Sequence, residues 1–298
     1  MRKLSRVLAC MVFLAPIYTS AGDIYKYKDE NGAWVFGDKQ PQVKSEKLNL
    51  KITKKKKNLE PEIFAEVSDE GTVLNIVNPF YAPVEIIVQS QVFDKGRIRI
   101  VVDANETKTI YEGQDSFSDA MMYWMLGDPN AEHDGTAYQA PSASHTKHKI
   151  TQSFKGRFSH SSEPNLYAVD LDMDIGTYIA AARSGIVIYV KDDYYYSGTK
   201  EYFADKANVV KVLHEDGTYA TYAHILGGTA SVKPGDVVQA GAKIARSGSS
   251  GFSTGPHLHF AVHKNAGMKT VSVPFEFVDG NGKRFVPVAG EYVGGAVE

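Results

Sequence analysis

The sequence has a single cysteine, Cys10, among its 298 residues. One thiol cannot form a disulfide or a cysteine-rich zinc site within a chain, so both are excluded. A large excess of charge is also missing, because 33 Lys and Arg residues stand against 35 Asp and Glu residues. The resulting formal net charge of -2 does not point to nucleic-acid binding, and we expect no such partner.

Long apolar runs are absent as well. The apolar run from Val7 to Tyr18 is too short to cross a bilayer, which takes about 20 residues, and no later segment looks transmembrane. Basic residues precede this run, and the small residues Thr19 to Ala21 follow it. This order is typical of an export signal, so we expect residues 1–21 to be a signal peptide and the mature chain to be periplasmic or secreted.

The rest of the chain favours strands, and from Lys149 onward no segment has a strongly amphipathic helical pattern. Alternating aromatic and polar residues around Asn31-Gly32 predict a β-hairpin, and Val- and Ile-rich segments punctuated by Pro79 and Pro83 predict a small β-sandwich. From Lys149 onward, short strand patterns alternate with glycine-rich turns. The predicted fold class is mainly β, with this order of parts: signal peptide (1–21), small N-terminal β module (22–40), linker (41–60), β-sandwich-like domain (61–112), connector (113–146), C-terminal antiparallel β-sheet domain (147–275) and C-terminal tail (276–298).

Two of the nine histidines stand in a pattern that indicates chemistry. His257 and His259 flank Leu258 in the segment GPHLHF. On a strand, residues two apart point to the same face, so both imidazoles face one way and Leu258 and Phe260 face the other. Two imidazoles are costly in a dry core without partners, but they are useful if one binds a metal and the other carries protons.

Five other histidines are expected to have no role in chemistry. The segment HEDGT, which begins at His214, superficially resembles a helical zinc motif, but position 218 is threonine and Asp216-Gly217 predicts a turn. His263 ends a predicted strand and is expected to be structural. The remaining three lie in the polar connector, where we expect exposure to solvent, although two of them are spaced closely enough to form a metal pair: His133, His145 and His148.

Four segments together resemble the lysostaphin-type, or LytM-type, zinc metalloendopeptidases, a family of peptidoglycan hydrolases. The resemblance covers roughly residues 147–275, and its motifs occur in the order that the family has. It says nothing about residues 23–146. The matching segments are FSHSSEPNLYAVDLDMDIGTYIAAARSGIVIYV, DGTYATYAHI, SVKPGDVVQAGAKIARSG and SGSSGFSTGPHLHFAV.

The resemblance implies a zinc site with one ion per chain. It assigns His160, Asp170 and His259 as ligands, which would leave a place for water at a tetrahedral ion. Many members place the first histidine four residues before the aspartate, where this chain has Leu166, and a subset places it farther upstream, as His160 is here. Geometry alone leaves Asp172 and Asp174 open as alternatives to Asp170, and the family pattern selects Asp170.

The resemblance also leaves two histidines for proton chemistry. It favours His257 as the general base, with His224 orienting water or stabilising the oxyanion, and the residues alone leave these two roles open. The predicted function is an exported zinc endopeptidase that hydrolyses peptide crosslinks of peptidoglycan. The alternatives are a non-catalytic regulator of amidases and a zinc protease acting on glycine-rich protein. A biotinyl-type carrier is disfavoured, because the similar segment VKPGDVVQAGAKIA has no matching lysine motif.

Overall fold

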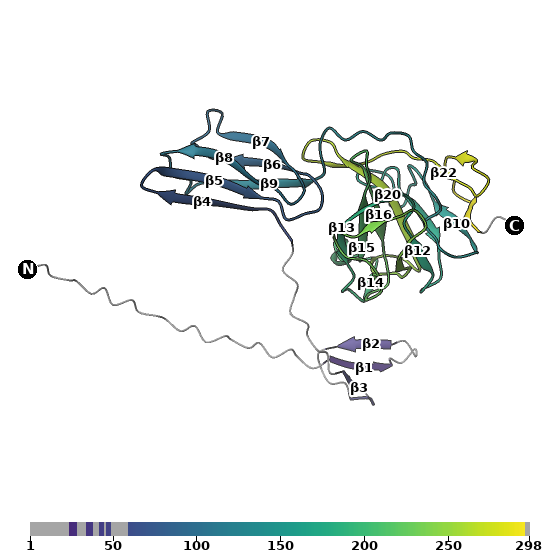
Figure 1. Ribbon diagram of the computed structural model, residues 1–298. Helices are drawn as coiled ribbons and strands as arrows, with labels where there is room; N and C mark the ends of the chain where they lie inside the picture. Colours follow the sequence, from purple (N-terminus) through teal and green to yellow (C-terminus); the bar gives the residue numbers. More distant parts are fainter. Residues whose placement is uncertain (1–23, 29–33, 38–41, 45, 49–58, 296–298) are drawn as a thin grey trace, which may run out of the picture. The chain divides into compact units, whose positions relative to one another are not determined.

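A computed structural model describes residues 24–28, 34–37, 42–44, 46–48 and 59–295 (Figure 1). The chain divides into two units, Met1–Asn58 and Leu59–Glu298. The expected signal peptide, residues 1–21, lies outside the described residues. Among the described residues, no helix has both the length and the apolar character that a membrane crossing requires.

The first unit contains one small antiparallel sheet. Its central strand, β1 (Ile24–Lys28), pairs with β2 (Trp34–Gly37) on one side and with β3 (Glu46–Leu48) on the other. The pairing of β1 with β2 extends from Tyr25 opposite Gly37 to Lys28 opposite Trp34. Strand β3 lies inside the 41–60 segment that we expected to be a linker.

The second unit begins with a sandwich of two three-stranded sheets (Figure 1). Strand β6 (Val84–Gln89) is the central strand of one of these sheets. Its alternate residues Ile86 and Val88 are fully buried between the sheets, as expected for a strand with one face in the core. One sheet consists of β4 (Glu62–Ser68), β5 (Gly71–Val77) and β8 (Thr107–Gly113), and the other of β7 (Arg97–Val102), β6 (Val84–Gln89) and β9 (Met121–Leu126).

Strand β9 lies within the segment 113–146, which we expected to be a connector. Its sequence, MMYWML, is apolar at every position, so no alternation of apolar and polar residues marked it as a strand. In the structure it pairs with β6, with Met125 opposite Glu85 and Met121 opposite Gln89. The sandwich therefore extends to Leu126, beyond its expected end at residue 112.

The remainder of the second unit is built on a nine-stranded antiparallel sheet. Its longest strand places Leu258, Phe260 and Val262 in the core, where each is fully buried. In sheet order the strands are β17 (Val237–Val238), β13 (Gly185–Lys191), β15 (Val209–Leu213), β16 (Tyr219–Ala223), β20 (His257–Asn265), β11 (Val169–Asp172), β10 (Lys147–Gln152) and β24 (Tyr292–Gly294), and β21 (Thr270–Ser272) also pairs with β20. The predicted fold class, mainly β with an antiparallel C-terminal sheet, is confirmed.

The C-terminal domain extends beyond the predicted range 147–275 at both ends. Tyr138 and Phe277 are fully buried in its core and form a bridge to each other, and β24 of the expected tail pairs with β10. The short elements that complete the domain are β12 (Tyr178–Ala180) with β18 (Lys243–Arg246), β14 (Ser197–Gly198) with β19 (Gly251–Phe252), β22 (Phe277–Val278) with β23 (Arg284–Phe285), and the 3-10 helix η1 (Glu201–Phe203).

A buried carboxylate fastens the sandwich to the end of β20. The Glu85 side chain accepts hydrogen bonds from Arg99 Nε, from Asn265 Nδ2 at 2.7 Å and from the Met268 backbone N–H at 2.7 Å. Burial would raise the pKa of Glu85, but these donors outweigh it and lower the pKa. Tyr219 of β16 also packs at this junction, where it joins the buried hydrophobic core of the sandwich. The strand that carries His257 and His259 is thus held at its far end.

Candidate metal centre and active site

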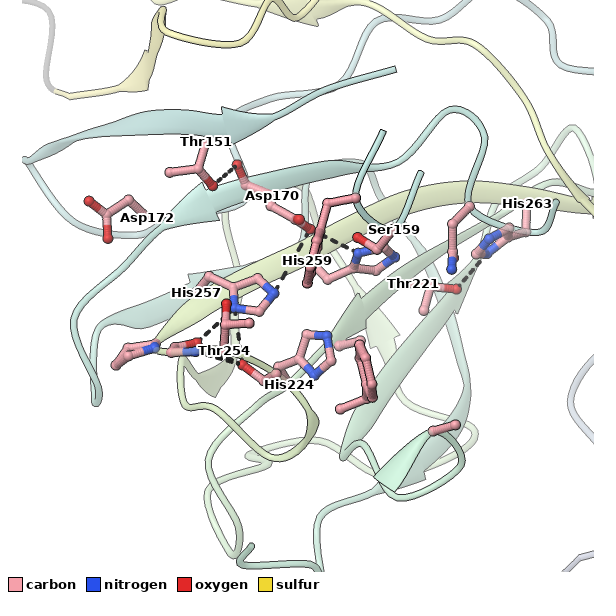
Figure 2. A pocket seen from close by; sticks show the side chains of 18 residues that line it. Thr151, Ser159, Asp170, Asp172, Thr221, His224, Thr254, His257, His259 and His263 are labelled. Atoms are coloured by element: carbon pink, nitrogen blue, oxygen red, sulfur yellow. Dashed lines mark hydrogen bonds and ion pairs between the residues drawn. The ribbon is translucent and has the colours of Figure 1, made fainter. Parts of the chain in front are cut away.

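The face of the sheet opposite the core is hollowed into a pocket of about 570 Å³ (Figure 2). Three adjacent strands bring its polar side chains together, because Asp170 on β11 and Ala223 on β16 both lie opposite His259 on β20. His257 and His259 line this pocket while Leu258 between them is buried, as the strand alternation predicted. His224, the residue after β16, reaches the same pocket.

His160 reaches this site from the loop between β10 and β11. It is fully buried, and its Nδ1 lies 3.1 Å from the Ser153 carbonyl oxygen. A carbonyl oxygen only accepts hydrogen bonds, so Nδ1 carries the proton and Nε2 keeps a free lone pair. That Nε2 atom lies 3.3 Å from Asp170 Oδ1 and 3.3 Å from His259 Nδ1. The loop therefore folds back far enough to bring His160 to Asp170, ten residues later in the sequence.

The three converging atoms suit a tetrahedral metal ion. The third side of their triangle, from His259 Nδ1 to Asp170 Oδ1, is 2.9 Å. Ligands about 2.0–2.2 Å from a tetrahedral ion lie about 3.3–3.6 Å apart, so small movements would complete the geometry. Burial would raise the pKa of Asp170, but the imidazole of His259, whose Nδ1 lies within hydrogen-bond distance, outweighs it and holds the pKa well below its usual range. Two imidazoles and one carboxylate form a donor set that zinc accepts.

Two further imidazoles lie beside this group with defined tautomers. The Nδ1 atoms of His224 and His257 lie 2.7 Å from the Ser250 carbonyl oxygen and 2.8 Å from the Gly255 carbonyl oxygen. Both Nδ1 atoms are therefore donors, and both Nε2 atoms keep lone pairs. The two ring centroids are 4.6 Å apart, and His257 Nε2 lies 3.9 Å from Asp170 Oδ1 (Figure 2).

The backbone of His224 is in the left-handed region, with a φ of 62°. This conformation costs a non-glycine residue about 1–3 kcal/mol and persists only where surrounding contacts enforce it. The bond from His224 to Ser250 is one such contact, and Ser250 itself donates from Oγ to the Ile225 carbonyl oxygen at 2.9 Å. Burial, followed by the charges of His257 and His259, lowers the pKa of His224 to about 3. The backbone strain thus serves to turn a neutral imidazole into the pocket.

The structure brings all five predicted site residues together: His160, Asp170, His224, His257 and His259. Of the two alternative carboxylates, Asp172 lines the pocket but does not belong to the converging group, and Asp174 does neither.

The expectation of exposure is wrong for His133, whose half-buried ring lies 3.2 Å from Asp216 Oδ2, and for His148, which is buried on β10. Its Nε2 lies within 2.9 Å of the hydroxyls of Ser142 and Ser144, and its Nδ1 donates to the Asp172 carbonyl oxygen at 3.0 Å. Both ring nitrogens are therefore used within the protein. His145 is exposed, as expected.

Sequence reasoning missed Gln152, the last residue of β10. Its amide contacts both Asp170 and the loop that carries His160. The sequence carried no signal for it, because the two-residue period of β10 predicts that Gln152 shares the face of His148 and the core residue Ile150. A register shift between Ile150 and Gln152 instead places Gln152 opposite Asp170. The backbone carbonyls that fix the imidazole tautomers had no signal either.

A second group of His and Asp side chains lies elsewhere in the second unit, formed by His133, Asp134 and Asp216. Here the Arg183 guanidinium lies 2.7 Å from a carboxylate oxygen of each aspartate. An arginine is permanently charged, so it already supplies the cation that a metal ion would provide. This group is therefore a structural ion-pair cluster, and the group around His259 is the candidate metal centre.

His214 packs beside this ion-pair cluster and should make stability depend on pH. Burial is the main cause that lowers its pKa to about 4. The unfolded chain protonates His214 below about pH 6.5 and the folded chain only near pH 4, so stability should fall as the pH drops through that window. His214→Asn can keep the hydrogen bond to the Ser184 carbonyl oxygen without a titrating ring.

Urea unfolding at pH 7.5 and pH 5, in a chelator so that metal does not contribute, measures this effect. We expect the loss of unfolding free energy between the two pH values to be about 2 kcal/mol smaller in His214→Asn than in the wild type. Equal losses in the two proteins would contradict the prediction.

Comparison with known proteins identifies the C-terminal domain. Residues 165–271 match the peptidase family M23. This segment is thus similar to the family M23 peptidase domain. It contains Asp170, His224, His257 and His259, whereas His160 lies five residues before its start.

The curated relatives share this peptidase domain. Lysostaphin of Staphylococcus staphylolyticus is 38% identical over 95 residues, which are 32% of this chain and 18% of the relative. The glycyl-glycine endopeptidase ALE-1 of Staphylococcus capitis is 33% identical over 120 residues, which are 40% of this chain and 30% of the relative. An uncharacterized metalloprotease of Buchnera aphidicola is 30% identical over 119 residues, which are 39% of this chain and 28% of the relative. The chain thus spans less than a third of the length of these relatives.

Proposed function

We propose that this protein is an exported zinc metalloendopeptidase that hydrolyses peptide crosslinks of peptidoglycan. One observation carries the proposal. Three ligand atoms, two from Asp170 and His259 in the segment that matches family M23 and one from His160 just before it, converge beside two imidazoles whose Nε2 lone pairs are free. A regulator that has lost its metal would have no need of this complete set, which favours an enzyme over a regulator of amidases.

The metal would be held by His160 Nε2, Asp170 Oδ1 and His259 Nδ1. A zinc ion there supplies a Lewis acid toward the scissile carbonyl and the attacking water. The protein contributes the fixed orientation of the ligands, because the Ser153 carbonyl holds the tautomer of His160. No residue of segment 113–146, which the structure describes in full, lines the pocket.

The two remaining imidazoles would move protons. His257 Nε2 is the nearer to the ligand group, at 3.9 Å from Asp170 Oδ1, so His257 is the general base that takes the proton of water and delivers it to the leaving amine. The Nδ1–H of His224 donates to a carbonyl oxygen, which leaves Nε2 of the neutral ring as an acceptor. This arrangement favours a role for His224 in orienting water over a role as donor to an oxyanion.

The substrate class follows from the relatives. Lysostaphin and a glycyl-glycine endopeptidase are similar to this domain, which supports a peptide bond in a cell-wall crosslink as the target. The similarity to the glycyl-glycine endopeptidase favours the alternative substrate, a glycine-rich protein that would be cleaved between glycine residues. Export follows from the predicted signal peptide at residues 1–21 and would place the mature enzyme in the periplasm or outside the cell, where peptidoglycan lies.

Digestion of purified sacculi by residues 22–298 tests the proposal. We expect the muropeptide profile to show loss of crosslinked dimers and release of new peptide termini, because the cleaved bond is a peptide bond. EDTA should abolish the change and added zinc should restore it, since no serine or cysteine nucleophile is required. Full activity in strong chelator would refute a metallopeptidase. Intact crosslinks together with cleavage of a glycine-rich peptide would favour the alternative substrate.

A further inference from the structure

Gln152 connects two of the candidate metal ligands through one side-chain amide. Its Nε2 donates to Asp170 Oδ2 at 2.9 Å, the carboxylate oxygen that does not face the imidazoles. The same Nε2 donates to Ser159 Oγ at 2.7 Å, one residue before His160. Its Oε1 accepts the backbone N–H groups of Phe158 at 3.1 Å and Ser159 at 3.2 Å. All four hydrogen-bonding positions of the amide are therefore used.

The loop between β10 and β11 needs such a connection. His160 is separated from Asp170 by nine residues, among them Pro164, and no regular strand pairing sets the distance between them. The backbone of His160 is fixed by its N–H, which donates to the Gly156 carbonyl oxygen at 3.1 Å. Gly156 also gives Gln152 room, because a Cβ at position 156 would lie 2.4 Å from Gln152 Cγ.

We propose that Gln152 is a positioning residue of the metal centre, which holds the loop of His160 and the carboxylate of Asp170 in one geometry. The inference rests on the proposed metal centre. Hydrogen bonds to a ligating carboxylate fix its orientation, and loss of such outer partners typically costs about 10–100-fold in metal affinity. Gln152 does not line the pocket, and its side chain bonds to Asp170 and to the loop of His160, so it would act through these ligands.

Zinc affinity measured by competition with a chelator tests the role. Gln152→Met keeps the length of the side chain and removes all four hydrogen bonds, so we expect zinc affinity to fall about 10–100-fold. Gly156→Ala changes no hydrogen-bonding group but pushes Gln152 aside, and should lower the affinity in the same direction. Gln114→Met is the matched control, because Gln114 is exposed and donates only to the Glu70 carbonyl oxygen in the sandwich.

Two further measurements separate positioning from a general structural role. The melting temperature in chelator should be nearly unchanged in Gly156→Ala, and the absorption spectrum of the cobalt-substituted protein should change in both site variants but not in the control. Wild-type zinc affinity and an unaltered cobalt spectrum in both site variants would overturn the inference. Failure of the wild type itself to bind zinc or cobalt would instead refute the proposed metal centre.

Discussion

His259→Ala should bind almost no zinc, whereas His257→Ala should bind about one zinc per chain and turn over very slowly. The two side chains lie on the same face of β20, two residues apart, yet only His259 has a nitrogen in the converging group. Loss of His259 leaves two ligands where a catalytic zinc site has three. Loss of His257 removes a proton carrier, which typically contributes about 10²–10⁴-fold to kcat.

Metal analysis and sacculus digestion on the two variants decide between these roles. His145→Ala is the matched control, because His145 is exposed and lies outside the pocket lining. If His257→Ala loses the metal and His259→Ala keeps it, the two roles are reversed. His224→Ala should retain zinc and lose less turnover than His257→Ala, and a larger loss in His224→Ala would make His224 the general base.

The fold class and the pairing of functional side chains were predictable because both follow from alternation along a strand. In β20 the pattern HLHF places apolar and imidazole side chains on opposite faces, and any antiparallel sheet keeps them there. The extent of the domains was harder to predict. Met121–Leu126 is apolar on both faces, and Phe277 joins the core from a segment rich in glycine and charge, so neither carried a clear periodic signal.

The fine geometry of the site depends on contacts that the sequence does not specify. The tautomers of His160 and His257 are set by the carbonyl oxygens of Ser153 and Gly255, and every residue has a carbonyl. His148 illustrates the same limit, because a polar segment predicted exposure while a pocket of serine hydroxyls buries the ring. Local composition predicts which residues can do chemistry, and the path of the chain decides which of them meet.

His160→Ala should reduce zinc affinity by more than about 100-fold while the β core stays folded. His160 supplies Nε2 as one of three ligand atoms, and even outer partners of a ligand are worth about 10–100-fold. The core residues of the domain lie on strands, and His160 lies in a loop outside that cluster. The segment that matches the family begins after His160, so this ligand is assigned from the geometry of the loop, which brings His160 Nε2 to 3.3 Å from Asp170 Oδ1.

Bound zinc and circular dichroism, measured on three alanine variants, decide the third ligand. His145→Ala should leave zinc binding and the spectrum unchanged, because the side chain is exposed. His148→Ala should lower stability without removing zinc, since both ring nitrogens of His148 bond within the protein. A folded His160→Ala protein with unchanged zinc and unchanged sacculus digestion would refute the assignment. Loss of zinc through His145 or His148 instead would mean that the segment before β10 reaches the metal, which the hydrogen bonds of His148 oppose.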